Sequence, residues 1–107
     1  MQFVVNNTTW NLIFVNPKSE HLRTSIGAYT LGVTDNNIKS VFIADNLSDY
    51  MTDKVLAHEI THVYAFEFEY YMPIEVEEIV ADFISLFGRD IIVLANDIMN
   101  NLLRSVA

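Results

Sequence analysis

The chain has 107 residues, of which 51% are hydrophobic and 19% charged, and this composition predicts one ordered globular domain, residues 1–107. The net charge of −8, with six scattered Lys and Arg, argues against a nucleic-acid partner. The chain has no Cys, so any metal site must use His and carboxylate ligands. No apolar segment reaches the ~18–20 residues of a membrane span, and the N-terminus lacks a basic signal region, so we expect a cytoplasmic protein.

The first 45 residues predict β-structure. The Asn pair at positions 6–7 is a turn signal, and the Asn-Pro pair at 16–17 ends a β-prone segment. Residues 19–25 are polar and predict a loop or one helical turn. Asp35–Asn37 predicts a tight antiparallel hairpin, and Gly32, just before it, predicts a bulge or a close approach of the backbone to another element. The expected strands cover residues 3–5, 10–15, 28–34 and 40–44.

The second half of the chain predicts helices, so the fold class is α+β. Asn46 or Ser48 can cap a helix that runs to about Phe68, and a second helix begins at residue 74 or 75. Gly88 is the expected position of a bend or break, which leaves open one long helix or two. Apolar residues of the second helix recur every three or four positions, at Val76, Val80, Phe83, Phe87, Ile91, Leu94, Ile98 and Leu102.

The first helix contains the segment His58-Glu59-Ile60-Thr61-His62, which has the form H-E-x-x-H. Residues four apart lie on one face of a helix, so the two imidazoles can hold one metal ion and Glu59 can reach a water on it. Random order of this composition gives only ~0.005 such segments. The flanking residues are apolar, and buried His pairs need partners that a metal supplies.

A third metal ligand is expected from the second helix, because catalytic zinc usually takes three protein ligands. The polar residues of this helix form a stripe along one face, at Glu75, Glu78, Asp82, Ser85 and Arg89. Such a stripe is also compatible with a solvated outer face. Glu75 and Glu77 compete with Glu78 for the ligand role. However, Glu77 is rotated by ~100° from Glu78, and Glu75 can serve as a charge of the first helical turn.

The motif is followed, sixteen residues after His62, by Glu78-Ile79-Val80-Ala81-Asp82, of the form E-x-x-x-D. This combination resembles the gluzincin metallopeptidases, and the chain is also similar to small phage-encoded and ImmA/IrrE-like metallopeptidases. The resemblance implies a minimal zincin-like fold, with a small sheet before two zinc helices. It also implies that Glu78 is the third ligand and that Asp82 accepts a hydrogen bond from a ligand His.

By this resemblance, His58, His62 and Glu78 hold Zn²⁺, and Glu59 is the general base for a zinc-bound water that hydrolyses a peptide bond. The expected partner is a polypeptide substrate or a regulatory protein, and gluzincin-like folds suggest Ser40–Ala44 as the strand that binds it.

The group that stabilises the oxyanion is not assigned by any motif. Tyr64, Tyr70, Tyr71 and His21 are candidates, although the alternative of packing aromatics is favoured because Tyr is common at such edges. Two competing interpretations remain open. One is a non-catalytic zincin-fold module that binds another protein, and the other is an α+β binding domain in which the motif is a coincidence and binds no metal. Oligomeric state is not predicted.

Overall fold

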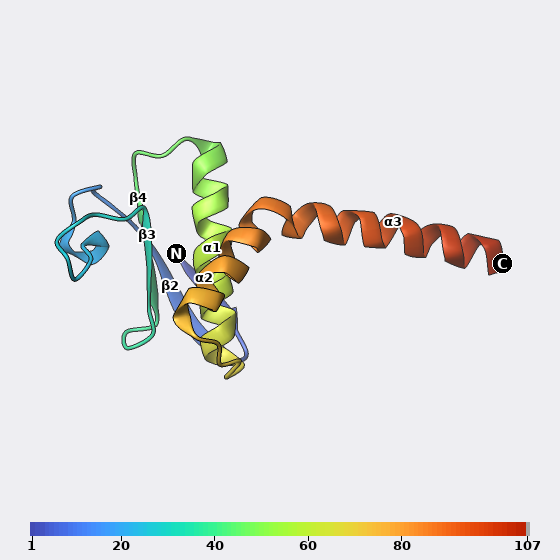
Figure 1. The fold of residues 1–107 in the computed structure, drawn as a ribbon, viewed down its shortest axis with the longest axis horizontal. Coiled ribbons are helices and arrows are strands. Elements are labelled where there is room, and N and C mark those ends of the chain that lie inside the picture. The colour runs from blue at the N-terminus through green and yellow to red at the C-terminus, as the bar shows by residue number, and fades with distance from the viewer. Residues whose placement is uncertain (107) are drawn as a thin grey trace.

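A four-stranded mixed sheet forms the N-terminal half of the protein in the computed structural model, which describes residues 1–106 (Figure 1). The strand order is β1-β2-β4-β3, in which β2 and β4 run parallel and the other two pairs antiparallel. The expected α+β class is therefore confirmed. The strands are β1 (Gln2–Val5), β2 (Thr8–Val15), β3 (Gly32–Asp35) and β4 (Ser40–Ala44).

Turn chemistry at two hairpins agrees with the sequence. Asn6 and Asn7 have φ of 48° and 63°, the left-handed pair that a two-residue hairpin requires. The antiparallel hairpin of β3 and β4 is also confirmed, with Asp35 opposite Ser40. The third strand is shorter than residues 28–34, because the chain before it forms a bend in which Thr24 N–H donates to Ala28 O.

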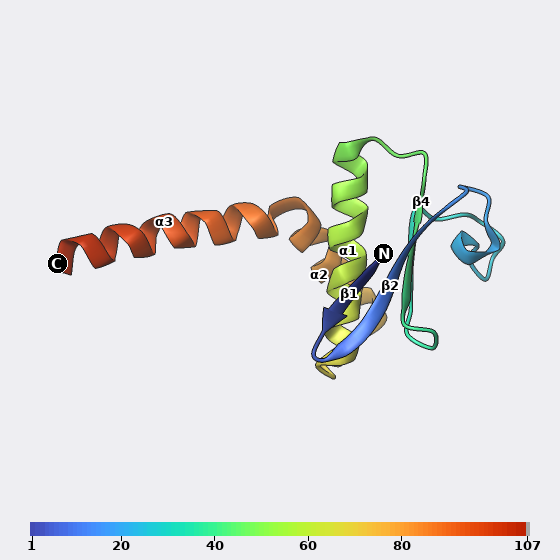
Figure 2. The same ribbon diagram turned by 180° about the vertical axis from the view of Figure 1, so that it is seen from behind.

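Helices follow the sheet. Ser48 is the N-cap, and its hydroxyl accepts a hydrogen bond from Met51 N–H at the start of α1. A π-helical turn joins the next two helices and ends at Gly88, the residue at which a bend was expected; the helix axis changes direction there (Figures 1 and 2). The helical elements are η1 (Glu20–Leu22), α1 (Asp49–Glu67), α2 (Ile74–Phe83), the π turn η2 (Ile84–Gly88) and α3 (Arg89–Val106).

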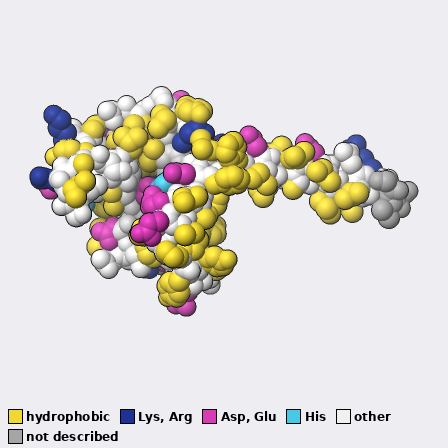
Figure 3. Space-filling view, viewed as in Figure 1, with side chains coloured by type: hydrophobic (Ala, Val, Ile, Leu, Met, Phe, Trp, Pro, Cys, Tyr) yellow, Lys and Arg dark blue, Asp and Glu magenta, His cyan; other side chains and the backbone are white. Residues whose placement is uncertain are grey.

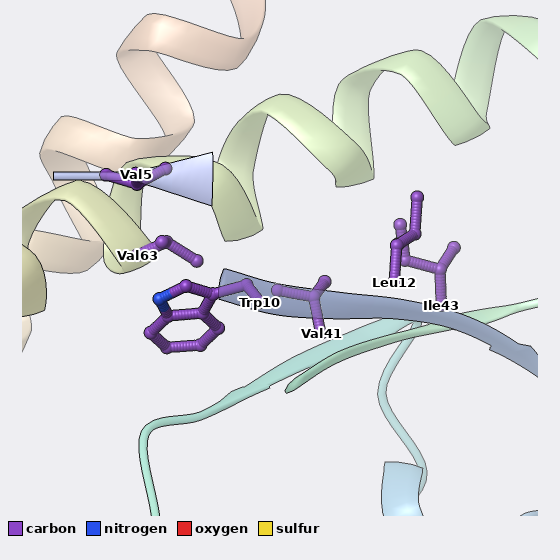
Figure 4. Packing of buried hydrophobic residues seen from close by; sticks show 6 residues of the cluster. All are labelled: Val5, Trp10, Leu12, Val41, Ile43 and Val63. Atoms are coloured by element: carbon purple, nitrogen blue, oxygen red, sulfur yellow. The ribbon is translucent and has the colours of Figure 1, made fainter. Parts of the chain in front are cut away.

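The main core lies between the sheet and α1. The ring of Trp10 is fully buried there, and its Nε1–H donates to Glu67 Oε1 on α1 at 3.0 Å. Alternate residues of a strand face one side, which is why β2 and β4 each contribute two side chains to this layer. The cluster contains Val5, Trp10, Leu12, Val41, Ile43 and Val63 (Figure 4).

The strand proposed for substrate binding lies in the interior of the sheet, so that expectation is wrong. β4 pairs with β2 on one side and with β3 on the other, and all five of its residues are buried. Its backbone groups are already paired and cannot accept an added strand. The parallel pairing with β2 is responsible, since it places β4 second from the edge and leaves β3 as the edge strand.

The molecule is elongated because α3 projects from the body (Figures 1 and 2). The Cα radius of gyration is 16.4 Å, whereas a compact domain of this length has ~13 Å. Within residues 1–106, no helix has the length and apolar character that crossing a membrane requires.

Candidate metal centre

Helix α1 presents His58 and His62 one turn apart on the side that faces α2. Their Nε2 atoms lie 3.2 Å from each other. His62 is buried with 6% of its surface exposed, and His58 is partly buried. The spacing of four residues in an α-helix is sufficient to aim both rings at one point.

Glu78 on α2 completes a group of three. Its Oε1 lies 2.9 Å from His62 Nε2, and its Oε2 lies 3.1 Å from His58 Nε2. One atom from each of the three residues falls within 4.8 Å of the others. The structure therefore brings together the three residues that were expected as ligands. Figure 3 shows acidic side chains gathered around a histidine on this face of the body.

Carboxylates also face the second nitrogen of each imidazole. Asp82 Oδ1 lies 2.9 Å from His58 Nδ1, a distance at which it can accept the hydrogen bond that the resemblance implies. Glu77 Oε1 lies 3.7 Å from His62 Nδ1, and Glu77 is buried with 8% of its surface exposed. The sequence interpretation treated Glu77 only as a rival ligand. Its rotation from Glu78 places it beside His62 instead, at a distance too long for a hydrogen bond.

Glu59 lies beside the triad but outside it. Its Oε2 is 3.9 Å from His58 Nε2, and its Oε1 accepts a hydrogen bond from Thr34 Oγ1 at 2.9 Å. Burial raises the pKa of Glu59 above its usual range, although the Thr34 hydroxyl and the two imidazoles oppose that rise. Thr34 was not predicted as a site residue. Alternate residues of a strand face the same side, so Thr34 lies on the same side of β3 as Gly32. This alternation is the signal that could have placed Thr34 against α1.

Comparison with protein-family models, curated proteins and solved structures gives no match for this chain.

The donor set fits a small divalent cation. When Nδ1 of His58 donates to Asp82, its Nε2 carries a lone pair, and that lone pair faces the electron-rich atoms of His62 and Glu78. Such an arrangement is stabilised by a positive charge at its centre, which a divalent cation or an added imidazole proton supplies. Separations of 2.9–3.2 Å suit ligands that share an ion at ~2.0–2.2 Å, and two His with one Glu is a known catalytic zinc set.

Two open hollows adjoin the triad, and His58 and Glu59 line both of them. One, of about 370 Å³, is lined by Met51, Val55 and Leu86 among others and contains Lys54. The second, of about 320 Å³, is lined by residues of β3, by the triad and by Phe66 of α1. Both hollows reach Gly32, so the edge strand forms a wall that they share.

The structure does not bring the oxyanion candidates to the triad. Tyr64 and Tyr70 line a separate apolar hollow between α1 and the connection to α2. Tyr71 is 85% exposed, and neither it nor His21 lines the two hollows beside the triad. His21 stacks on Phe42 with ring centroids 4.0 Å apart, on the other face of the sheet. These positions agree with packing or surface roles.

Proposed function

We propose that this protein is a minimal zinc-dependent metallopeptidase. The observation that carries the proposal is the convergence of His58 Nε2, His62 Nε2 and the Glu78 carboxylate beside an unliganded, buried Glu59. A purely structural metal site has no use for that extra carboxylate, whereas peptide hydrolysis needs a base at this position. The absence of Cys is compatible with a reducing compartment, and we place the activity in the cytoplasm.

The proposed chemistry divides between the ion and Glu59. Zinc held by His58, His62 and Glu78 would supply Lewis-acid polarisation of the peptide carbonyl and make water more acidic. Glu59 takes a proton from the attacking water and delivers it to the leaving amine. Thr34 holds one carboxylate oxygen of Glu59 and leaves Oε2 directed toward the triad.

The substrate is best accommodated against β3. This strand pairs with β4 along one side and is one of the two edge strands, on the side of the sheet opposite β1, so its other side can accept an extended peptide. Gly32 and Thr34 contribute to the hollows that contain His58 and Glu59. An added peptide strand would therefore pass alongside both the base and the triad.

The test combines metal content with cleavage. Purified protein should contain close to one zinc per chain by elemental analysis and should cleave members of a mixed peptide library. Glu59→Gln should retain the zinc and lose ~10²–10⁴-fold in cleavage rate, since it removes only the base. Glu75→Gln, which changes an exposed Glu on α2, is the matched control and should cleave normally. Loss of zinc from Glu59→Gln, or unchanged cleavage by it, would contradict the proposed role.

A second candidate is a zincin-fold module that binds a regulatory protein without cleaving it. Two observations favour it. The hollows beside the triad are open, and none of the Tyr side chains expected to stabilise the oxyanion, nor His21, lines either hollow. Wild-type protein that carries zinc but cleaves no library peptide would select this alternative. Protein that binds no metal under any loading condition would exclude both candidates.

A further inference from the structure

Helix α3 exposes a broad apolar face. Ile91, Leu94 and Ile98 are 48%, 60% and 50% exposed, and Ile92 and Met99 widen the face to about half of the helix circumference. Figure 3 shows hydrophobic side chains along this projecting helix. Monomeric proteins rarely leave so large a continuous apolar surface in water, so the face indicates an interface.

Helix α3 carries no net charge, in contrast to the rest of the chain. Within α3, Arg89 and Arg104 balance Asp90 and Asp97, so the helix is neutral and the net charge of −8 belongs to residues 1–88. A second α3 can therefore approach without like-charge repulsion. An anionic membrane is a poorer occupant, because surface-binding helices are rich in Lys and Arg on their polar face.

We propose that α3 pairs with α3 of a second copy of the chain, in an antiparallel arrangement. With 18 residues, full antiparallel overlap separates the two acidic bodies by ~27 Å of helix, beyond the ~8 Å Debye length at physiological salt. Parallel pairing would instead hold both bodies at the same end. The antiparallel pair is a two-fold symmetric, self-complementary contact of the two apolar faces, with the charged residues of α3 on the outer side.

The available area is enough for a reversible dimer. Each half-exposed Ile, Leu or Met offers on the order of 50–100 Å² of apolar surface. The five residues of this face thus offer on the order of 250–500 Å² per copy. That is below a standard interface and in the range of transient ones, so we expect a weak, reversible dimer with a dissociation constant of about 1–10 μM.

Sedimentation equilibrium of the full chain tests the pairing. Wild-type protein should change from monomer to dimer across this concentration range. Ile98→Glu should weaken the dimer at least ~100-fold, because both copies lose a buried contact and gain a charge. Val93→Glu is the matched control: Val93 is 53% exposed and lies ~140° around the helix from Ile98. It should leave the dissociation constant within threefold of wild type. Circular dichroism should show both variants folded.

Three results would overturn the pairing. They are a wild-type monomer at 100 μM or more, a dimer that survives Ile98→Glu, and equal weakening by both Glu variants. A wild-type monomer that sediments with anionic phospholipid vesicles would identify a lipid surface as the occupant and would equally overturn it. None of these outcomes depends on zinc or on peptide cleavage.

Orientation can be read from single introduced cysteines, because the chain has none of its own. Position 98 is near the middle of α3, so in an antiparallel pair the two Ile98→Cys side chains lie close to each other. They should form a disulfide under mild oxidation. Ile91→Cys lies toward one end, where antiparallel copies are held ~20 Å apart and should not cross-link. Efficient cross-linking of Ile91→Cys would contradict the antiparallel arrangement.

Discussion

Gly32 lies where the edge strand crosses α1, and replacing it by Ala should destabilise the protein for a steric reason. An added Cβ would lie 2.7 Å from Val55 Cγ1, 3.0 Å from Glu59 Cγ and 3.2 Å from Glu59 Oε2. Ordinary carbon contacts are ~3.5–4.0 Å, so the overlap with Val55 is about 1 Å. Overpacking of this kind costs ~1–3 kcal/mol, and Ala regains ~0.5–1 kcal/mol over Gly in chain entropy. We expect a net loss of ~1–2 kcal/mol.

Urea unfolding followed by the fluorescence of Trp10 measures this loss, because Trp10 is the single Trp and is fully buried. Val55→Ala removes the atom in closest contact with the new Cβ and completes a double-mutant cycle. The double variant should be at least ~0.5–1 kcal/mol more stable than the sum of the single losses predicts. A Gly32→Ala variant as stable as wild type, or strictly additive losses, would refute the steric explanation.

Three further predictions concern the metal centre and the sheet. Saturating zinc, at ~1,000 times its dissociation constant, should stabilise the wild type by ~4 kcal/mol in thermal unfolding, and His62→Ala should lose this gain; an equal gain in the variant would exclude the assigned ligand. Asp82→Asn should weaken zinc ~10–100-fold in a chelator competition while keeping the ligands intact, and unchanged affinity would argue against an orienting role. Glu67 accepts a hydrogen bond from Lys39 Nζ, which lowers its pKa. Its contribution is therefore complete above the ordinary carboxyl pKa and is lost as pH falls through the lowered value. Glu67→Gln should unfold at lower urea than wild type at pH 7, and the two midpoints should converge in acid; a constant difference would contradict this linkage.

Local features of the fold could be predicted because they depend on a few neighbouring residues. The paired Asn residues require the left-handed conformations of a tight hairpin, and Ser48 can cap a helix wherever that helix lies. In the same way, the spacing of His58 and His62 is a property of helical geometry, and the two Nε2 atoms lie 3.2 Å apart in the structure. The Gly within the third strand also indicated the close approach to α1 that the structure contains.

Tertiary structure alone decided which strand is at the edge and which groups surround the imidazoles. The parallel pairing of β2 with β4 joins segments distant in sequence, and no local pattern distinguishes a strand paired on two sides from one paired on one. Glu77 lies beside His62, and Thr34 donates to Glu59, only because α2 and β3 both pack against α1. Periodicity gives the face on which a side chain lies, whereas the partner of that face depends on long-range packing. For α3, the same periodicity gives an apolar face that the described chain leaves exposed.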